Sequence, residues 1–536
     1  MSSLYARKAL LPSGWAEGVR FEISAGRIQS VDRGASFVDD EFDAGIVIPG
    51  ICNAHSHAFQ RALVGRTERR SPAGEDNFWT WRHEMYRLAN AIDPDTMRVI
   101  ARQVYTEMLA AGYTTVAEFH YLHQTAGDSG STDAMIEAII SAAEEAGIRL
   151  TLVPILYERA GFDSPKPDDV QGLFVKAFDD FVSLYESAKD LIGERSTVGV
   201  GVHSLRAVTK ESIDRIAELA SAEGVPLHIH LAEQQREVDD CLVHYKTRPA
   251  RWLLDRCEVD ANWCLVHATH LEPDEISAIA RSGAVVCLCP STEANLGDGI
   301  FPLAAYLNEG GSIAIGSDSH VTIDPFEELR WLEYGQRLTA QSRNISVACG
   351  AHTGYALINR VASGGPRACG QETGRLEAGA MADLLVLDDT DPMLLGHEAD
   401  TLMDALVFAG YRVPVERVMV HGEWRVLEGR HVSEDSARKD YGRVVEALRS
   451  GLLGCVGVGG RASHDQRKAQ EEHDQRSHQL THFVGRSLSQ GLLRTLRPRG
   501  EFRRPRAPTV ATAHSRRRAA PPASCSCPIP PPEPYP

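Results

Sequence analysis

The chain has 536 residues, 43% of them hydrophobic, and a formal net charge of −17 at pH 7. This length accommodates one large domain with a smaller satellite, or two to three domains of ordinary size. Because no apolar run approaches the roughly 20 residues of a membrane span and the first residues lack the apolar core of an export signal, we expect a cytoplasmic protein that has no membrane partner. The excess of negative charge argues against non-specific binding of nucleic acid.

Strand-like segments occur near the N-terminus and again in the last part of residues 1–450. They span residues 19–23, 26–31, 382–388 and 415–424. Short runs of this kind, with no helical pattern between neighbouring segments, are typical of β-strands. We therefore predict one small composite β-sandwich formed by residues 1–48 and 375–435.

Between these ends, eight short β-rich runs alternate with segments of helical periodicity. The runs span residues 46–51, 114–119, 150–156, 198–202, 226–231, 263–266, 284–289 and 312–316. This alternation predicts an α/β fold, a (β/α)₈ TIM-type barrel over residues 49–374, with an open doubly wound sheet as the alternative. The barrel is favoured because nearly every chemically reactive residue follows the C-terminal end of a run, where barrel active sites assemble.

Two histidines follow the first run. His55 and His57 lie two positions apart, and side chains at positions i and i+2 of a strand share one face, so both imidazoles can bind one cation. Neutral imidazole suits zinc, iron or copper. The motif alone is weak, because such a pair is more often solvated or hydrogen-bonded than metal-binding.

Three later runs carry residues of the same kind. The fifth run has His228 and His230 on one face and is followed by Glu233; His230 is the better ligand because it lies nearer the C-terminal end. The sixth run leads to His267 and the eighth to Asp318. A buried Asp at a strand end is costly unless it binds a cation. Together with the pair of His55 and His57, these three strand ends follow one another in strand order and predict one metal centre.

The end of the chain differs in composition from the rest. From residue 451 onwards there are 14 basic and six acidic residues, so this part carries a net charge of +8 and residues 1–450 carry −25. It contains Gly-rich, His/Gln/Arg-rich and Pro-rich stretches with almost no apolar periodicity, and we expect residues 450–536 to be disordered. The alternative, a basic arm that binds RNA, predicts salt-dependent binding that is lost on deleting this tail.

With these residues in this order, the sequence resembles the amidohydrolase superfamily, in its mononuclear deaminase branch, over roughly residues 1–440. The matching residues are His55-Ser56-His57, His230 with Glu233, His267 and Asp318. The resemblance implies that His55, His57, His230 and Asp318 hold one Zn²⁺, with iron as the alternative. The carboxylated lysine that bridges two metals in other branches has no candidate at the fourth strand, which favours a single metal.

Longer segments resemble, more narrowly, the formimidoylglutamate deiminase family. They span residues 55–61, 78–82, 117–121, 203–209 and 291–299. The resemblance implies that the substrate is contacted by Gln60, Arg82, Tyr121, His203 and Arg206. Two arginines suit a small-molecule dicarboxylate, because planar guanidinium groups bind carboxylates through two parallel hydrogen bonds.

This family resemblance implies hydrolytic deimination of N-formimidoyl-L-glutamate to N-formyl-L-glutamate and ammonia, in histidine degradation. Asp318 would accept a proton from the attacking water, Glu233 would protonate the imine nitrogen, and His267 would steady the attacking oxygen. A homodimer is expected on the resemblance alone. The alternatives are a ring aminohydrolase of the guanine deaminase kind, whose base pocket would not need two arginines, and a non-catalytic barrel scaffold, which would not need a metal.

Overall fold

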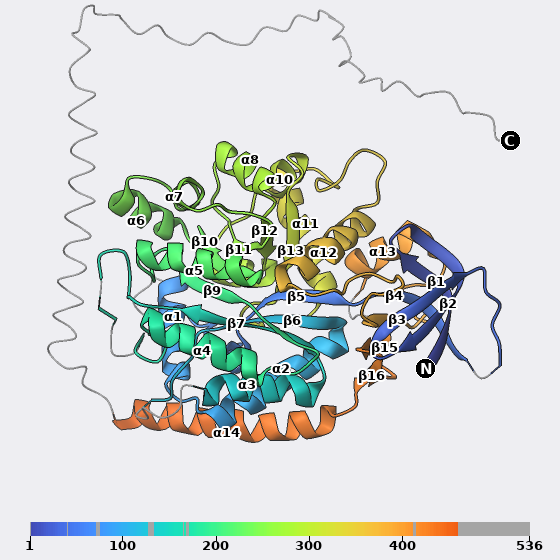
Figure 1. Cartoon of the computed structure of the whole chain (residues 1–536), viewed down its shortest axis with the longest axis horizontal. Coiled ribbons are helices and arrows are strands. Elements are labelled where there is room, and N and C mark those ends of the chain that lie inside the picture. The colour runs from blue at the N-terminus through green and yellow to red at the C-terminus, as the bar shows by residue number, and fades with distance from the viewer. Residues whose placement is uncertain are drawn as a thin grey trace, which may run out of the picture. The chain divides into compact units, whose positions relative to one another are not determined.

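Eight parallel strands form a barrel in the part of the chain that the structure describes (Figure 1). The structure is a computed structural model and describes residues 2–39, 41–70, 76–126, 133–164, 166–167, 171–410 and 414–458, with side chains as far as residue 450. The barrel strands are, in spatial order, β5 (Ile51–Ser56), β6 (Tyr113–His120), β7 (Arg149–Leu156), β9 (Val200–Ser204), β10 (Leu227–Leu231), β11 (Trp263–His267), β12 (Val285–Leu288) and β13 (Ser312–Ile315). The short β8 (Thr197–Val198) pairs with β7. The predicted barrel is confirmed.

The last and first strands meet just beyond the end of β13. The backbone N–H of His57 donates to the carbonyl oxygen of Asp318 at 3.0 Å, and the N–H of Asp318 donates to the carbonyl oxygen of His55 at the same distance. These bonds accompany a parallel bridge between Ser56 and Asp318. The seam that closes the barrel is therefore built from residues predicted to bind metal.

Helices connect the strands and surround the barrel. They are the 3₁₀-helix η1 (Ala58–Leu63), α1 (Phe78–Ala89), α2 (Pro94–Ala111), α3 (Ala134–Ala146), α4 (Phe178–Leu191), α5 (Lys210–Glu223), α6 (Gln235–Tyr245), α7 (Pro249–Arg256), α8 (Pro273–Ser282), α9 (Pro290–Leu296), α10 (Leu303–Asn308), α11 (Pro325–Ala340) and α12 (Thr353–Cys369). No helix among the described residues combines the length and the apolar character needed to cross a membrane.

The first barrel strand lies later in the chain than the sequence predicts. The run at 46–51 was expected to be this strand, but most of it belongs to β4 (Phe42–Pro49), which pairs with strands of a second sheet. The break falls at Gly50, where a side chain would collide with Thr114, since an added Cβ would lie 2.2 Å from its Oγ1. His55 consequently lies within β5 rather than after it, and the register of β5 against β6 shifts between Asn53 and Ser56. A bulge of this kind re-aims side chains.

The second sheet draws strands from both ends of the described chain. Its order is β17 (Arg430–His431), β16 (Glu423–Leu427), β15 (Val415–Val420), β14 (Leu384–Leu387), β4, β1 (Ser2–Leu11), β2 (Gly14–Ser24) and β3 (Arg27–Arg33). In this sheet β4 pairs in parallel with β1 and antiparallel with β14. The predicted composite β-domain from the two chain ends is confirmed, as one connected sheet (Figure 1).

The two faces of β14 belong to different cores. Leu384 and Val386 pack into the second sheet's own apolar core, whereas Leu385 and Leu387 join the core of the barrel. Successive side chains of a strand point to opposite faces, so a continuous apolar run is what a strand between two cores requires. Apolar contact through this strand fixes the second sheet to the barrel.

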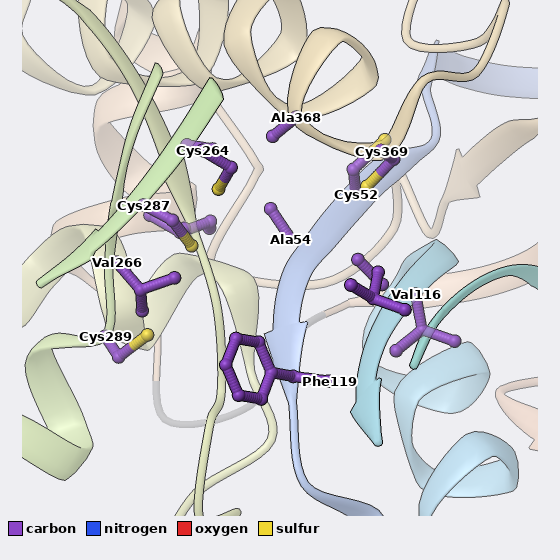
Figure 2. Close-up of a cluster of buried hydrophobic side chains, with 14 of the residues drawn as sticks. Cys52, Ala54, Val116, Phe119, Cys264, Val266, Cys287, Cys289, Ala368 and Cys369 are labelled. Carbon is purple, nitrogen blue, oxygen red and sulfur yellow. The ribbon is translucent and has the colours of Figure 1, made fainter. Parts of the chain in front are cut away.

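The C-terminal end of α12 crosses the N-terminal end of the barrel. His228 Nε2 donates to the carbonyl oxygen of Ala368 at 2.8 Å, and Thr151 Oγ1 donates to that of Cys369 at 2.7 Å. Figure 2 shows Ala368 facing the barrel interior and Cys369 beside Cys52 of β5. The side chains around this point are small, apolar or thiol-bearing and almost fully buried. The base of the barrel is therefore filled, and His228 belongs to this base.

Two helices follow strands of the second sheet, one after β14 and one after the edge strand β17. They are α13 (Ala399–Phe408) and α14 (Glu434–Val458), and Arg102 of α2 holds α14 through a 2.7 Å hydrogen bond from Nη2 to Ser436 Oγ. The tail predicted to be disordered begins inside α14, whose last residues are helical rather than irregular. Residues 459–536, the greater part of that tail, lie outside the described residues.

Candidate active site

A cavity opens at the C-terminal ends of the barrel strands. It encloses about 500 Å³ of empty space. Its walls are formed by His57, Gln60, Phe78, Trp81, Arg82, Met85, Tyr86, Tyr121, Tyr157, Phe174, His203, Arg206, His230, Glu233, His267, Leu296 and Asp318. Ten of the eleven predicted site residues therefore line one cavity together, and the eleventh, His55, contacts His57 and His230 at its edge.

The four predicted metal ligands converge on one point. Nε2 of His55 lies 3.0 Å from Nε2 of His230 and 3.7 Å from Oδ1 of Asp318. Nε2 of His57 lies 3.4 Å from the same Asp318 oxygen. The potential ligand atoms of His55, His57 and Asp318 all lie within 4.8 Å of one another.

Hydrogen bonds on the far side of two rings fix which nitrogen faces this point. Nδ1 of His57 lies 3.0 Å from the carbonyl oxygen of Phe119, and Nδ1 of His230 lies 3.0 Å from that of His203. A carbonyl oxygen can only accept, so each Nδ1 carries the proton and each Nε2 presents a lone pair. The Nε2 lone pairs of His57 and His230 are therefore available to a cation.

Burial favours the neutral histidine form that binds metal, whereas it raises the pKa of the fourth ligand, Asp318, to about 7. It lowers the pKa of His57 to about 3 and the pKa values of His55 and His230 well below the ordinary value. The three imidazoles are therefore neutral at pH 7. Neutral imidazole nitrogens together with one carboxylate are a donor set that zinc and other first-row divalent metals accept. The residues present thus fit a single divalent cation.

His267 and two glutamates lie on the opposite side of Asp318. Nε2 of His267 is 3.6 Å from Asp318 Oδ2 and 4.0 Å from Glu233 Oε1, and its Nδ1 is 3.2 Å from Glu293 Oε1. Burial alone would lower the pKa of His267, but the negative charges of Glu233, Asp318 and Glu293 raise it to about 10. His267 is therefore held as a hydrogen-bond donor beside three carboxyl groups.

Several of these residues adopt a strained backbone conformation. His267 has φ +66° and Asp318 has φ +46°, in the left-handed region that only a few per cent of non-glycine residues adopt. The neighbouring residue Ala268 has φ +48°, and its N–H donates to the carbonyl oxygen of Leu231 at 3.0 Å. Such conformations persist only where the surroundings hold them, and they occur often at active sites.

The two predicted arginines form no close ion pair with another described residue, although the negative charges of Glu237 and Glu233 act on Arg206. Among the residues that the structure describes, neither Arg82 nor Arg206 forms an ion pair within 4.0 Å. Arg206 is only 5% exposed, and its Nε and Nη1 have no hydrogen-bond partner. A buried guanidinium with free donors is costly unless a ligand supplies acceptors. Both side chains line the cavity, so an anionic ligand can reach them.

The remaining predicted contacts also line the cavity. Gln60 Nε2 donates to Tyr121 Oη at 2.9 Å, and the Gln60 side-chain oxygen is buried without a partner. The ring of His203 packs edge-on against Tyr121 and Tyr157. These side chains offer both donors and acceptors to a polar ligand.

Some residues of the site are absent from the sequence prediction. Tyr157 follows β7 and Tyr86 lies on α1, and their hydroxyls approach Gln171 Nε2 at 3.1 and 3.2 Å. Glu293 orients His267 and also accepts the backbone N–H of Cys289 at 2.9 Å. The position of Tyr157 at a strand end is a signal that could have revealed it. Tyr86 offers no such sequence signal, because its position depends on how α1 folds back over the barrel.

Known proteins resemble this chain over most of its length. Residues 46–425 match the family model for the amidohydrolase family, and residues 1–41 match that for the N-terminal domain of formimidoylglutamate deiminase HutF. A formimidoylglutamate deiminase of Pseudomonas aeruginosa is 47% identical, covering 84% of this chain and 100% of the relative. An 8-oxoguanine deaminase of the same species is 28% identical, covering 73% of this chain and 84% of the relative.

A solved structure supports the same grouping. The crystal structure of an amidohydrolase from Brucella melitensis has a TM-score of 0.80 and 39% sequence identity, and covers 84% of this chain and 100% of that one. Family match, sequence identity and fold agree over the barrel and the second sheet. The protein therefore belongs to the amidohydrolase family, in its formimidoylglutamate deiminase branch.

Proposed function

We propose that the protein hydrolyses N-formimidoyl-L-glutamate to N-formyl-L-glutamate and ammonia, as a step of histidine degradation. The observation that carries this proposal is the pair of arginines, Arg82 and Arg206, which face the metal-binding residues across one cavity without a protein carboxylate as partner. The 47% identical relative is a formimidoylglutamate deiminase. The two carboxylates of this substrate would be repelled at long range by residues 1–450, which carry a charge of −25, so local guanidinium groups are needed to bind them.

We propose one Zn²⁺ per subunit, held by His55, His57, His230 and Asp318. Such an ion would supply Lewis acidity and would lower the pKa of water to about 7. The geometry of the donors supports one divalent cation; the choice of zinc over iron rests on the family resemblance.

The chain's own residues divide the proton transfers between them. Asp318 accepts a proton from the attacking water as its oxygen adds to the formimidoyl carbon. Glu233 delivers a proton to the imine nitrogen as the water oxygen adds, which gives a tetrahedral carbon with one hydroxyl and one amino group. His267 donates a hydrogen bond to the oxygen that becomes the formyl group. Asp318 then passes its proton to the amino group while the hydroxyl proton goes to Glu233, so that the carbon–nitrogen bond breaks and ammonia leaves. One water is consumed, and both carboxyl groups regain their starting protonation states.

The substrate's two carboxylates are assigned to Arg82 and Arg206. Gln60, Tyr121 and His203 contact its polar groups between the arginines and the reacting carbon. A ring aminohydrolase would leave the buried guanidinium group of Arg206 and the partly buried one of Arg82 without an anion, which disfavours that alternative.

The first experiment measures ammonia release from N-formimidoyl-L-glutamate by the zinc-loaded protein, with guanine as the alternative substrate. Arg206→Ala is compared with Arg215→Ala, an arginine on the outer surface that pairs with Asp179 at 3.1 Å. We expect release from the linear amidine alone, lost in Arg206→Ala and retained in Arg215→Ala, with equal zinc contents. No release by protein that holds zinc would refute the substrate assignment.

Zinc identity and a homodimer are further proposals that rest on the resemblance. Metal analysis of protein purified without added metal tests the first. Light scattering of the eluting protein during gel filtration tests the second, and a monomeric mass would contradict it.

A further inference from the structure

Three guanidinium groups surround the indole ring of Trp79. The Cζ atoms of Arg82, Arg206 and Arg236 lie 4.6, 5.4 and 4.6 Å from its ring centroid. These arginines come from three separate segments, since Arg82 is in α1, Arg206 follows β9 and Arg236 is in α6. Trp79 is therefore the common neighbour of cations that the sequence keeps far apart.

The first turn of α1 fixes the backbone of Trp79. Asn77 is the N-cap, and its Oδ1 accepts the backbone N–H of Trp79 at 2.9 Å. Thr80 completes a capping box by accepting the N–H of Asn77 at 3.0 Å. A capping box satisfies donors that would otherwise be free at a helix start, so the indole extends from a defined point.

Trp79 is a neutral partner that all three arginines share. Like charges repel, and burial together with the charges of Arg206 and Arg236 lowers the pKa of Arg82. The face of an indole attracts a cation through its quadrupole. This attraction acts on the flat face of the guanidinium group. The indole therefore takes no hydrogen bond from the N–H groups at the edge of the guanidinium group. A carboxylate partner would occupy those N–H groups, whereas Trp79 leaves them free for a ligand.

We propose that Trp79 is a positioning residue that holds Arg82 and Arg206 in the orientation that binds the two carboxylates of the substrate. This inference rests on the proposed function and adds to it the residue that keeps the arginines in place before substrate arrives. Trp79 does not line the cavity, so it acts through the arginines. Arg236, whose side chain is 52% exposed, extends the same cationic cluster to the surface.

The test compares Trp79→Leu, which removes the aromatic face, with Trp79→Phe, which keeps a smaller one. Trp331→Leu is the control, because Trp331 is 44% exposed on α11 and is no part of the cavity wall. The readouts are KM and kcat for N-formimidoyl-L-glutamate and the calorimetric Kd of N-formyl-L-glutamate, all with the zinc-loaded protein.

We expect Trp79→Leu to raise KM and Kd by about tenfold, as loss of cation–π contacts of ordinary strength implies, while kcat changes by less than about twofold. Trp79→Phe restores most of the affinity, and Trp331→Leu matches the wild type. Unchanged KM and Kd, or a fall in kcat alone, would overturn the positioning role. If the wild type itself releases no ammonia, the proposed function fails instead, and the two failures are distinguishable. If Trp79→Leu does not fold, the comparison of Trp79→Phe with wild type still tests the positioning role, because a smaller increase in Kd is expected for Trp79→Phe.

Discussion

Arg149 and Asp383 form a buried, two-pronged ion pair between the barrel and the second sheet. Nε of Arg149 lies 2.7 Å from Oδ2 of Asp383, and Nη2 lies 3.0 Å from Oδ1. Asp383 also accepts the backbone N–H of His421 at 2.7 Å and the hydroxyl of Thr373 at 2.9 Å. The pair therefore connects the start of β7 to the segment that precedes β14 and to the residue that follows β15.

Breaking this pair should destabilise the protein strongly. We expect Arg149→Met to lower the free energy of unfolding by about 3–5 kcal/mol, because it leaves a buried carboxylate without its counter-charge. Arg149→Met with Asp383→Leu should cost less than the sum of the two single changes. Urea denaturation measures these differences, with the exposed Arg215→Met as control. Additive single effects would contradict the coupling.

Glu118 should strengthen metal binding without being a ligand. Its carboxylate accepts the Ser56 hydroxyl at 2.5 Å and the Ala58 N–H at 2.7 Å, on either side of His57, and the Tyr105 hydroxyl at 3.1 Å. We expect Glu118→Ala to weaken zinc affinity by about 10–100-fold, the usual cost of losing a residue that orients ligands. Competition with a chromophoric chelator measures it. Tyr105→Phe, which removes one of the three bonds, should have the smaller effect.

Glu293 should matter for turnover more than for binding. Its contact with Nδ1 of His267 fixes the direction in which Nε2 points. We expect Glu293→Gln to lower kcat by about 10–100-fold, with KM and zinc content nearly unchanged. Steady-state kinetics and metal analysis test this, with the exposed Glu309→Gln as control. A variant that has lost zinc would point to a structural role instead.

The contact between His352 and Asp404 should make stability depend on pH. His352 Nδ1 lies 2.6 Å from Asp404 Oδ2, and this hydrogen bond raises the pKa of His352 above 6.5. The folded state thus holds the proton more tightly than the unfolded state. The contribution is fully present below pH 6.5 and is lost as the pH rises through the folded-state pKa. Urea denaturation of His352→Asn and wild type should therefore differ at low pH and converge at high pH. A constant difference would exclude this linkage.

The sequence predicts barrel strands well where they are buried on both faces. The run before His267 is one continuous apolar segment, as expected of a parallel strand covered by helices. The segment around Gly50 is harder, because β4 and β5 are consecutive apolar strands of different sheets. Only the close approach of Thr114 to Gly50 separates them, and that contact depends on the folded barrel.

The candidate site also contains some residues that the sequence can predict and others that it cannot. Residues that end a strand, such as His230 and Asp318, can be predicted because the barrel brings all strand ends to one face. Glu118 and Trp79 cannot, since their roles depend on contacts with residues that are distant in the chain. Glu118 meets Ser56 across 62 positions, and Trp79 meets Arg206 and Arg236 only once α1 has folded over the cavity.

The pairing of β4 has a consequence for the order of folding. One edge of β4 pairs with β1, which is nearby in the chain. The other edge pairs with β14, which is synthesised more than about 330 residues later. At roughly 5–20 residues per second, synthesis of that stretch takes on the order of tens of seconds. Throughout this interval the nascent edge of β4 is open to pairing with other chains. The domain whose strands leave the ribosome first is therefore the last to be completed.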